Sequence, residues 1–303
     1  MNKILLGDVE VSRVVEWRGP FATTDVLFPS VPGALWRRHA SWLAPDFVDA
    51  TTGAWQATVQ TWVLRSAGRT VLVDTGLGND KRRDVEVFHE RDGDFLDQLA
   101  AAGVRPEDVD LVVNTHLHND HVGWNTRLID GAWVPTFPNA RYLINRADFD
   151  FWNPRNGHVP RSPFQSAPDT AVMFHDSVRP VHEAGQVVLW DGERHRIDEH
   201  LVLEPAPGHT PGSTVLWLES GTDRAVFAGD LVHTPLQLIE PEHDTCLSED
   251  QAEATRSRHR LLARAAATNS LVVPAHLGGA GAAEVVRSNG TFAIKRWAPF
   301  SGA

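Results

Sequence analysis

The chain has 303 residues, of which 42% are hydrophobic and 22% are charged, a balance typical of a folded globular protein rather than a disordered or fibrous one. Its 39 acidic and 28 basic residues give a formal net charge of −11. This charge argues against a nucleic-acid groove, because binding to phosphates needs clustered positive charge. We interpret the single short basic run, Lys81-Arg82-Arg83, as a solvated loop.

The N-terminal residues and the apolar runs favour a soluble, cytoplasmic protein without a membrane partner. The chain reaches Asp8 before any secretory apolar region, and no apolar run approaches the length that would span a membrane. Cys246 is the only cysteine, so no intrachain disulfide can form. We expect Cys246 to be a small buried or neutral residue rather than a nucleophile.

The first third of the chain predicts paired strands at residues 57–65 and 70–74, followed by a glycine-rich loop over 74–80. Apolar residues then recur at helical spacing over 95–102. Asp94 is placed to cap this helix and Gly103 to end it.

A short apolar strand at 110–114 leads directly into a histidine-rich segment. Further strands are predicted at 141–145, 201–204, 214–218, 225–228 and, as the last one, 271–274. Ser248 and Gln251 form a capping-box signature for a long helix that runs towards Asn269. Strands in both halves with intervening helices predict an α+β fold, in which two sheets pack face to face under outer helices.

The segment 153–180 is rich in Pro, Asn, Ser and Gly, and is either a mobile lid or a long surface excursion. No repeat and no composition shift marks a linker. We therefore expect a single domain over residues 1–303.

The chemistry-bearing residues are concentrated where predicted strands end. The segment after the 110–114 strand contains three imidazoles and a carboxylate within six residues: His116, His118, Asp120 and His121. Three further candidates each follow a later strand: His209, Asp230 and His276. Imidazole nitrogen and carboxylate oxygen are ligands that suit zinc and similar ions, and burying them together would otherwise be costly. Five histidines and two carboxylates are enough for two metal ions.

With these residues in place, the sequence resembles the metallo-β-lactamase superfamily, whose pattern is HxHxDH followed by a distant His, an Asp and a final His. The match runs from Asp74 to His276. The resemblance implies an αβ/βα sandwich of two mixed β-sheets with helices on the outer faces. It also implies one metal held by His116, His118 and His209, a second held by Asp120, His121 and His276, Asp230 as the bridge, and Asp74 as a support for the loop.

Two positions indicate a branch of the superfamily. His118 stands where members that perform di-iron redox chemistry typically carry an acid, so the resemblance favours hydrolysis. Asp230 stands where several β-lactam-hydrolysing members have Cys. The segment 229–237 and the downstream Thr255-Arg256 are similar to the branch that contains methyl parathion hydrolase and N-acyl homoserine lactonases.

The resemblance also suggests residues that meet the substrate. His233 falls where many lactonases have a substrate-contacting Tyr, and it either donates a hydrogen bond to the developing oxyanion or only orients Asp230. Trp124 replaces a small residue at the pocket edge. Trp124 and Trp152 are candidates for substrate contact, although the sequence favours ordinary core packing for both.

The expected activity is hydrolysis of a lactone or carboxylic ester, with promiscuous phosphotriester hydrolysis, by a hydroxide that bridges two divalent ions. Such binding lowers the pKa of water to about 7. Asp120 and His233 are the expected catalytic side chains. Zinc is the expected metal, and manganese, cobalt and iron suit the same ligands. A homodimer is suggested by the resemblance alone.

Two alternatives remain open from the sequence. Thioester hydrolysis of the glyoxalase II kind uses the same ligand positions, but that family adds a basic C-terminal region. The segment 286–303 of this chain contains only Arg287, Lys295 and Arg296 as basic residues. The other alternative is a metal-binding protein without catalysis.

Overall fold

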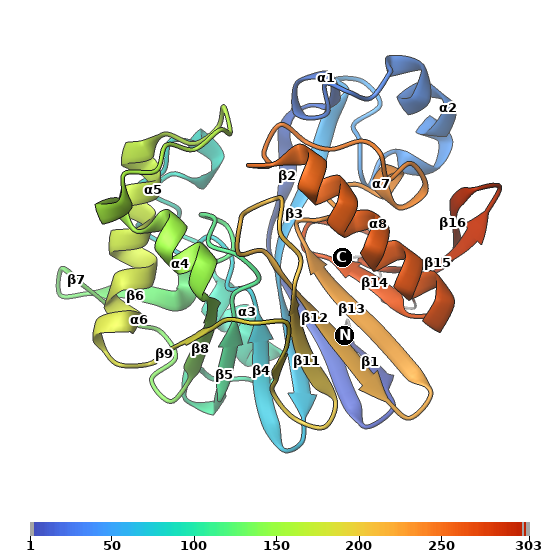
Figure 1. Cartoon of the computed structure of the whole chain (residues 1–303). Helices are drawn as coiled ribbons and strands as arrows, with labels where there is room; N and C mark the ends of the chain where they lie inside the picture. The colour runs from blue at the N-terminus through green and yellow to red at the C-terminus, as the bar shows by residue number, and fades with distance from the viewer. Residues whose placement is uncertain (1–2, 299, 301–303) are drawn as a thin grey trace.

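The computed structural model describes residues 3–298 and residue 300, and it contains two seven-stranded sheets packed face to face with helices outside them (Figure 1). The first sheet has the order β1-β2-β3-β4-β5-β8-β9; the strands from β4 onward are parallel and the earlier pairs antiparallel. Its strands are β1 Lys3–Leu6, β2 Val9–Thr23, β3 Ala54–Ser66, β4 Arg69–Val73, β5 Leu111–Val113, β8 Arg141–Asn145 and β9 Val187–Trp190. A small hairpin pairs β6 Thr126–Ile129 with β7 Ala132–Pro135.

The second sheet has the order β10-β11-β12-β13-β14-β15-β16, with β13 and β14 parallel and all other pairs antiparallel. Its strands are β10 His195–Arg196, β11 Leu201–Pro205, β12 Thr214–Ser220, β13 Asp223–Gly229, β14 Leu271–Pro274, β15 Ala283–Ser288 and β16 Thr291–Trp297. The prediction that 271–274 is the last strand is wrong, since the β15–β16 hairpin follows it.

The helices lie mainly in connections between strands. The α-helices are α1 Thr24–Leu27, α2 Gly33–Leu43, α3 Phe95–Ala101, α4 Arg146–Trp152, α5 Ala167–Met173, α6 Arg179–Glu183, α7 Leu236–Ile239 and α8 Gln251–Thr268. Short 3₁₀ helices span Glu86–Phe88, Pro106–Asp108, Gly123–Asn125 and Pro154–Asn156, and a π-helix spans Phe174–Val178. No helix in the described part of the chain is long and apolar enough to cross a membrane.

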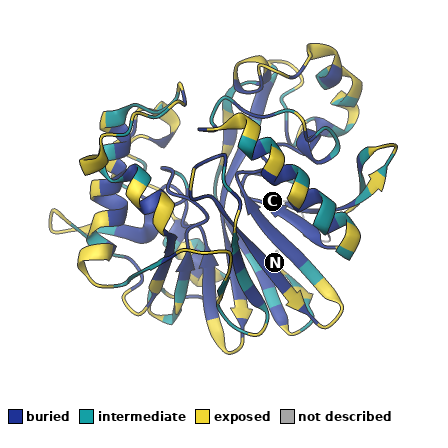
Figure 2. Cartoon of the chain, in the orientation of Figure 1, coloured by how far each residue is buried: buried dark blue, intermediate teal, exposed yellow. Residues whose placement is uncertain are grey.

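The main core lies between the two sheets, because alternate residues of each strand face the opposite sheet. Trp62 of β3, for example, meets Phe227 of β13 edge to face, with ring centroids 5.9 Å apart. Figure 2 shows the strands as largely buried and the outer helix faces as exposed. The predicted two-sheet α+β architecture is confirmed.

Each sheet also has a helix packed on its outer face. In α8 the buried apolar residues Leu261, Leu262 and Ala265 lie on one side of the helix and pack on the second sheet. On the first sheet, Phe95 and Leu99 of α3 pack against the face that points away from the main core. These helices cover part of the second face of each sheet.

Two predicted helix caps are wrong in detail. The α8 cap is Asp250, whose side chain accepts the backbone N–H of Glu253 at 2.9 Å. Ser248 instead lies 3.3 Å from Nδ1 of His209. Asp94 stands at the start of α3, but its carboxylate accepts the side-chain amide of Gln98 rather than a backbone N–H.

The basic run at 81–83 is not a solvated loop, and that interpretation is corrected. Only Arg82 is exposed, whereas Lys81 and Arg83 are buried. Arg83 forms a two-pronged ion pair with Asp176 at 2.7 and 2.9 Å. Lys81 donates to the Thr126 hydroxyl at 2.8 Å, and burial lowers the pKa of its amine to about 7. Asp176 of the π-helix pairs with both Lys81 and Arg83. These ion pairs connect the loop at 81–83 to the π-helix.

The segment 153–180 is not structureless, since α5 and the π-helix lie within it and α6 begins at its end. Ser166 caps α5 by accepting the backbone N–H of Asp169 at 3.2 Å. Near its start, Arg161 donates to the side chain and backbone of Glu249. Whether the segment moves as a lid stays a prediction.

Candidate metal centre

The predicted metal ligands meet where strands of both sheets end. The segment 116–121 follows β5, Asp230 follows β13 and His276 follows β14, while His209 lies in the turn between β11 and β12. Because β13 and β14 run parallel, Asp230 and His276 emerge at the same edge of the second sheet. A backbone hydrogen bond from Thr214 to Thr115 joins that edge to the first sheet. The ligand loops of the two sheets therefore face one another.

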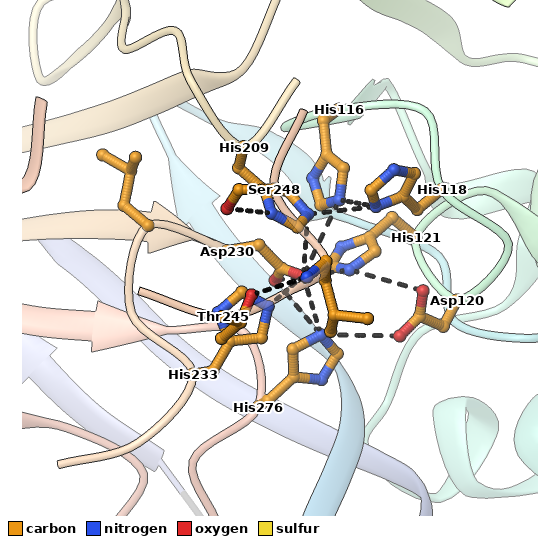
Figure 3. Close-up of polar contacts among 12 residues, drawn as sticks. His116, His118, Asp120, His121, His209, Asp230, His233, Thr245, Ser248 and His276 are labelled. Atoms are coloured by element: carbon orange, nitrogen blue, oxygen red, sulfur yellow. Dashed lines mark hydrogen bonds and ion pairs between the residues drawn. The ribbon is translucent and has the colours of Figure 1, made fainter. Parts of the chain in front are cut away.

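The first group of ligand atoms contains three imidazoles and one carboxylate (Figure 3). Nδ1 of His118 lies 3.0 Å from Nε2 of His116 and 3.0 Å from Nε2 of His209. Oδ2 of Asp230 lies 3.3 Å from Nε2 of His209. All four side chains are buried, and one ligand atom of each lies within 4.8 Å of the others.

The second group contains Asp120, His121 and His276. Nε2 of His276 lies 3.4 Å from Oδ2 of Asp120, and Nε2 of His121 lies 3.7 Å from its Oδ1. The other oxygen of Asp230, Oδ1, lies 3.1 Å from His276 and 3.4 Å from His121. Oδ2 of Asp230 also lies 3.2 Å from Nε2 of His276, so the Asp230 carboxylate lies between the two groups and all seven predicted ligands come together.

The electrostatics of this cluster fit a bound divalent cation of the zinc type. Burial lowers the pKa of His116 and His118 well below the usual value, so both imidazoles are neutral, which is the metal-binding form. Burial also opposes a charge on His121, yet Asp230 and Asp120 raise its pKa well above the usual value. This excess of negative charge is what a cation would balance.

Buried polar atoms without hydrogen bonds also indicate that the cluster binds a cation. Nε2 of His121 and Oδ1 of Asp230 are buried, and although other predicted ligand atoms lie close to them, none of these contacts has the geometry of a hydrogen bond in the described structure. A buried polar atom without a partner costs about 1–3 kcal/mol. Metal coordination would satisfy both atoms at once.

Hydrogen bonds hold four of the histidine rings by the nitrogen that faces away from the cluster. The partners of Nδ1 are the Thr115 hydroxyl for His116, Asp74 for His121, the Thr58 carbonyl for His276 and the Ser248 hydroxyl for His209. Such contacts set the tautomer and the ring orientation of metal-binding histidines. The rings are therefore oriented by the protein itself.

Comparison with known proteins agrees with this geometry. The family model described as "Metallo-beta-lactamase superfamily" matches residues 55–276, which include every proposed ligand. The chain belongs to the metallo-beta-lactamase superfamily.

Both a relative matched by sequence and solved structures matched by fold are similar to this metallo-beta-lactamase superfamily chain. Metallo-beta-lactamase domain-containing protein 1 of Mus musculus is 31% identical over 186 residues, which cover 61% of this chain and 54% of that protein. The match thus spans about half of the length of that relative. Among solved structures, hydrolase AbOPH has a TM-score of 0.79 at 22% identity and covers 99% of this chain and 97% of its own. The lactonase AidC, solved with the product N-hexanoyl-L-homoserine, has a TM-score of 0.76 at 22% identity and the same coverage. The predicted superfamily is confirmed, and a lactonase stands among its structural neighbours.

The cluster of predicted ligands in this superfamily member lies at one end of a cavity. Its apolar wall consists of Phe21, Trp55, Ala57, Val85, Phe88, Phe164 and Leu247. Its polar lining consists of His118, Asn119, Asp120, Ser162, Gln165, Asp230, His233 and His276. None of these lining residues is a lysine or an arginine. The aromatic wall was not predicted, because its residues come from separate segments without a shared motif.

His233 is the one predicted substrate-contacting residue that lines the cavity. It is buried, and its Nε2 lies 3.1 Å from Oδ2 of Asp230. Burial lowers the pKa of His233, so its imidazole is neutral and keeps one N–H. This position is compatible with both predicted roles.

The two tryptophans lie elsewhere. Trp124 stacks on Phe95 with centroids 5.3 Å apart and donates its N–H to Glu16 at 2.8 Å. The prediction that Trp124 lies at the pocket edge is therefore wrong, because its ring packs on Phe95 and its N–H binds Glu16. Trp152 packs behind His118, with centroids 5.2 Å apart, and is not among the lining residues.

One residue missed by the sequence analysis holds two ligand loops together. The Asp148 carboxylate accepts the backbone N–H of Leu117 at 2.8 Å and that of Gly212 at 2.7 Å. Leu117 lies between two ligands, and Gly212 lies three residues after His209. Asp148 is an acid inside a short helix, which carries no sequence signal for such a role.

Replacing Asp74 by Asn should weaken metal affinity about 10- to 100-fold, the usual effect of removing an orienting partner. Asp74 accepts the backbone N–H and hydroxyl of Thr115 and faces Nδ1 of His121 at 2.9 Å. Its φ of +57° is a conformation that Asn adopts readily, so the backbone should be retained. Titration against a chelator measures the affinity. The matched control is Asp191→Asn in an exposed ion pair, and equal affinities in both variants would contradict the prediction.

A second prediction concerns the pH dependence of stability that arises from Glu16, which binds the loop that follows Asp74. Glu16 is half-buried, and its carboxyl accepts the backbone N–H groups of Leu77 and Gly78 and the indole N–H of Trp124. Burial raises the pKa of Glu16 from 4.5 to about 7. The folded state therefore binds more protons than the unfolded state between these values, and its stability falls as pH rises through this window. Glu16→Gln has no titrating group there. The free energy of unfolding of the native chain, minus that of Glu16→Gln, should fall from pH 4.5 to 7; a constant difference would refute the assignment.

Proposed function

We propose that the chain is a dinuclear metal-dependent hydrolase of lactones or carboxylic esters. The observation that carries this proposal is the pair of ligand groups that share Asp230 at the polar end of an apolar cavity. Zinc suits the mixed imidazole and carboxylate donors, and manganese, cobalt and iron suit the same set. Two such ions, when bound, would activate water and polarise the carbonyl oxygen of the substrate.

The residues of the chain would then handle the proton and the developing charge. Asp120 is the only half-buried ligand of the seven, and its carboxylate lines the cavity. We assign to Asp120 the transfer of a proton from the attacking water to the leaving oxygen. His233, neutral and exposed to the cavity, would donate its N–H to the oxygen on which charge develops.

The lining of the cavity supports an uncharged substrate. Phe21 contacts Phe88 and Phe164 with ring centroids 5.6 and 5.1 Å apart, which forms a continuous aromatic wall opposite the ligands. No lysine or arginine lines this cavity, so no permanently charged side chain there would pair with the carboxylates of a glutathione thioester. A lactone or ester with an apolar acyl or leaving group fits better, and neutral phosphotriesters would fit as secondary substrates.

The test combines metal content with hydrolysis rates of the purified chain. The panel contains an N-acyl homoserine lactone, an aryl ester, a neutral phosphotriester and a glutathione thioester. We expect about two metal ions per chain and the highest kcat/KM on the lactone or the aryl ester. A preference for the thioester would overturn the proposed substrate class. Two bound metal ions with no turnover of any substrate would favour a metal-binding protein without catalysis.

A further inference from the structure

Residues 157–165, here called the strap, form one side of the cavity beside the metal cluster. Ser162, Phe164 and Gln165 of the strap line the cavity together with predicted metal ligands. The strap lies between a short 3₁₀ helix and α5, and it contains no helix or strand of its own. A substrate in the cavity would therefore lie against this segment.

The strap packs only weakly on the rest of the protein. Ser162 is its only buried residue, and Val159 is 68% exposed. Its ring contacts are those of Phe164 with Phe21 and of His158 with two aromatic residues of α4. Segments with few buried contacts open locally at a low cost in free energy. Packing alone therefore contributes little to holding the strap closed.

The hydrogen bonds that join the strap to distant parts of the described chain converge on one residue, Glu249. The carboxylate of Glu249 accepts the backbone N–H of Arg161 at 3.1 Å, and its backbone carbonyl accepts from the Arg161 guanidinium at 2.9 Å. Nε2 of His158 lies 3.5 Å from the second carboxylate oxygen. The side chain of Glu249 is 6% exposed, so these contacts are largely shielded from water, which strengthens them.

Glu249 is itself attached to the ligand loop of the second sheet. Its backbone N–H donates to the carbonyl oxygen of His209 at 2.9 Å, and it directly precedes Asp250, the cap of α8. The strap therefore reaches from α4 and α5, which pack beside the first sheet, to the start of α8, which packs on the second (Figure 1). One residue thus connects the strap to the other half of the sandwich.

We propose that Glu249 is a positioning residue that holds the strap over the cavity, and that the strap opens at this contact to admit substrate and release product. Glu249 is not among the residues that line the cavity, so it acts on a substrate only through the strap. Loss of its carboxylate should therefore weaken substrate binding and leave the chemical step unimpaired. The inference rests on the proposed hydrolase function, but the opening itself can be measured without turnover.

The first test measures hydrogen–deuterium exchange of the purified chain without substrate. In Glu249→Ala the backbone N–H of Arg161 loses its acceptor, so the amides of the strap should exchange about 10-fold faster than in the native chain. Glu249→Gln keeps an oxygen that can accept this N–H and should exchange at nearly the native rate. Glu242→Ala, which removes an exposed partner of His259, is the matched control and should change nothing. Exchange in β5 should be the same in all variants, which shows that the fold is retained.

The second test measures hydrolysis of an aryl ester by the metal-bound chain. Glu249→Ala should raise KM roughly 10-fold without lowering kcat, and its metal content should equal that of the native chain. Glu249→Gln should stay close to the native values. If Glu249→Ala fails to fold, Arg161→Met tests the same contact, because it removes only the bond from an exposed guanidinium. It should raise both the exchange rate and KM roughly 3-fold.

Each outcome has a distinct meaning. Unchanged exchange of the strap in Glu249→Ala would overturn the inference and leave the proposed function intact. Faster exchange with a native KM would also overturn it, because the opening would then not concern the substrate. A lower kcat together with loss of metal would show that Glu249 supports the ligands instead. No hydrolysis of any substrate by the metal-bound native chain would reject the proposed function, and the exchange rates alone would then decide whether Glu249 holds the strap.

Discussion

Replacing Asp230 by Ala should lower kcat/KM by more than about 100-fold, which exceeds the loss expected from orienting residues alone. The reason is that Oδ2 of Asp230 belongs to the first ligand group and Oδ1 faces the second. One substitution therefore removes a ligand from both groups. Bound metal, measured by elemental analysis after dialysis, should fall together with activity.

The matched control for this change is Asp191→Ala, which removes a carboxylate from an exposed ion pair with Arg146. It should leave metal content and activity unchanged, because exposed pairs contribute little. Asp230→Ala with full metal content and native rates would reject the shared role of Asp230.

The second large effect is expected on stability. Arg258 of α8 is completely buried, and its guanidinium donates to the carbonyls of Leu231, Pro241 and His243 and to the Asp244 carboxylate at 2.6 Å. Arg258→Met fills similar volume but leaves Asp244 as an uncompensated buried charge. The free energy of unfolding should fall by about 3–5 kcal/mol. Urea unfolding at pH 7 measures it.

Two further variants separate charge from packing. Arg256→Met removes an exposed arginine from the same helix and should cost about 0–1 kcal/mol. The double variant Arg258→Met, Asp244→Asn removes both charges and should recover part of the loss. A single Arg258→Met variant as stable as Arg256→Met would show that the buried pair contributes nothing.

The metal ligands could be predicted because each one is marked by the short stretch of sequence around it. His116, His118, Asp120 and His121 lie within one hexapeptide after an apolar strand, and His209, Asp230 and His276 repeat the same arrangement of strand and ligand. Their chemistry is nearly independent of the rest of the fold. The sharing of Asp230 came from the resemblance to the superfamily, and its geometry is now visible in the two oxygens.

The cavity wall and the inner supports could not be predicted, because they depend on long-range packing. Phe21 and Phe164 meet across more than a hundred residues, and nothing in either segment signals the contact. Trp124 was misplaced for the same reason, since its partner Glu16 lies on β2.

Local signals also failed where tertiary partners changed their meaning. The basic run at 81–83 has the composition of a surface loop, but Asp176 supplies the buried counter-charge. Ser248 has the spacing of a helix cap, but its hydroxyl lies beside His209. The bounds of β8 were predicted to the residue, and α8 ends one residue before Asn269, towards which its helix was predicted to run.

The predicted ligands of the metal centre come from both sheets, so metal binding should affect how fast the protein is degraded in a cell. A bound cation would fasten the two halves of the sandwich at the end where the strands stop, and its binding energy would add to the stability of the folded chain. A chain without metal would open more often at that end and present its loops to proteases. When the metal is scarce, the protein should therefore lose activity and also be degraded faster. Its amount in the cell should then depend on the supply of the ion.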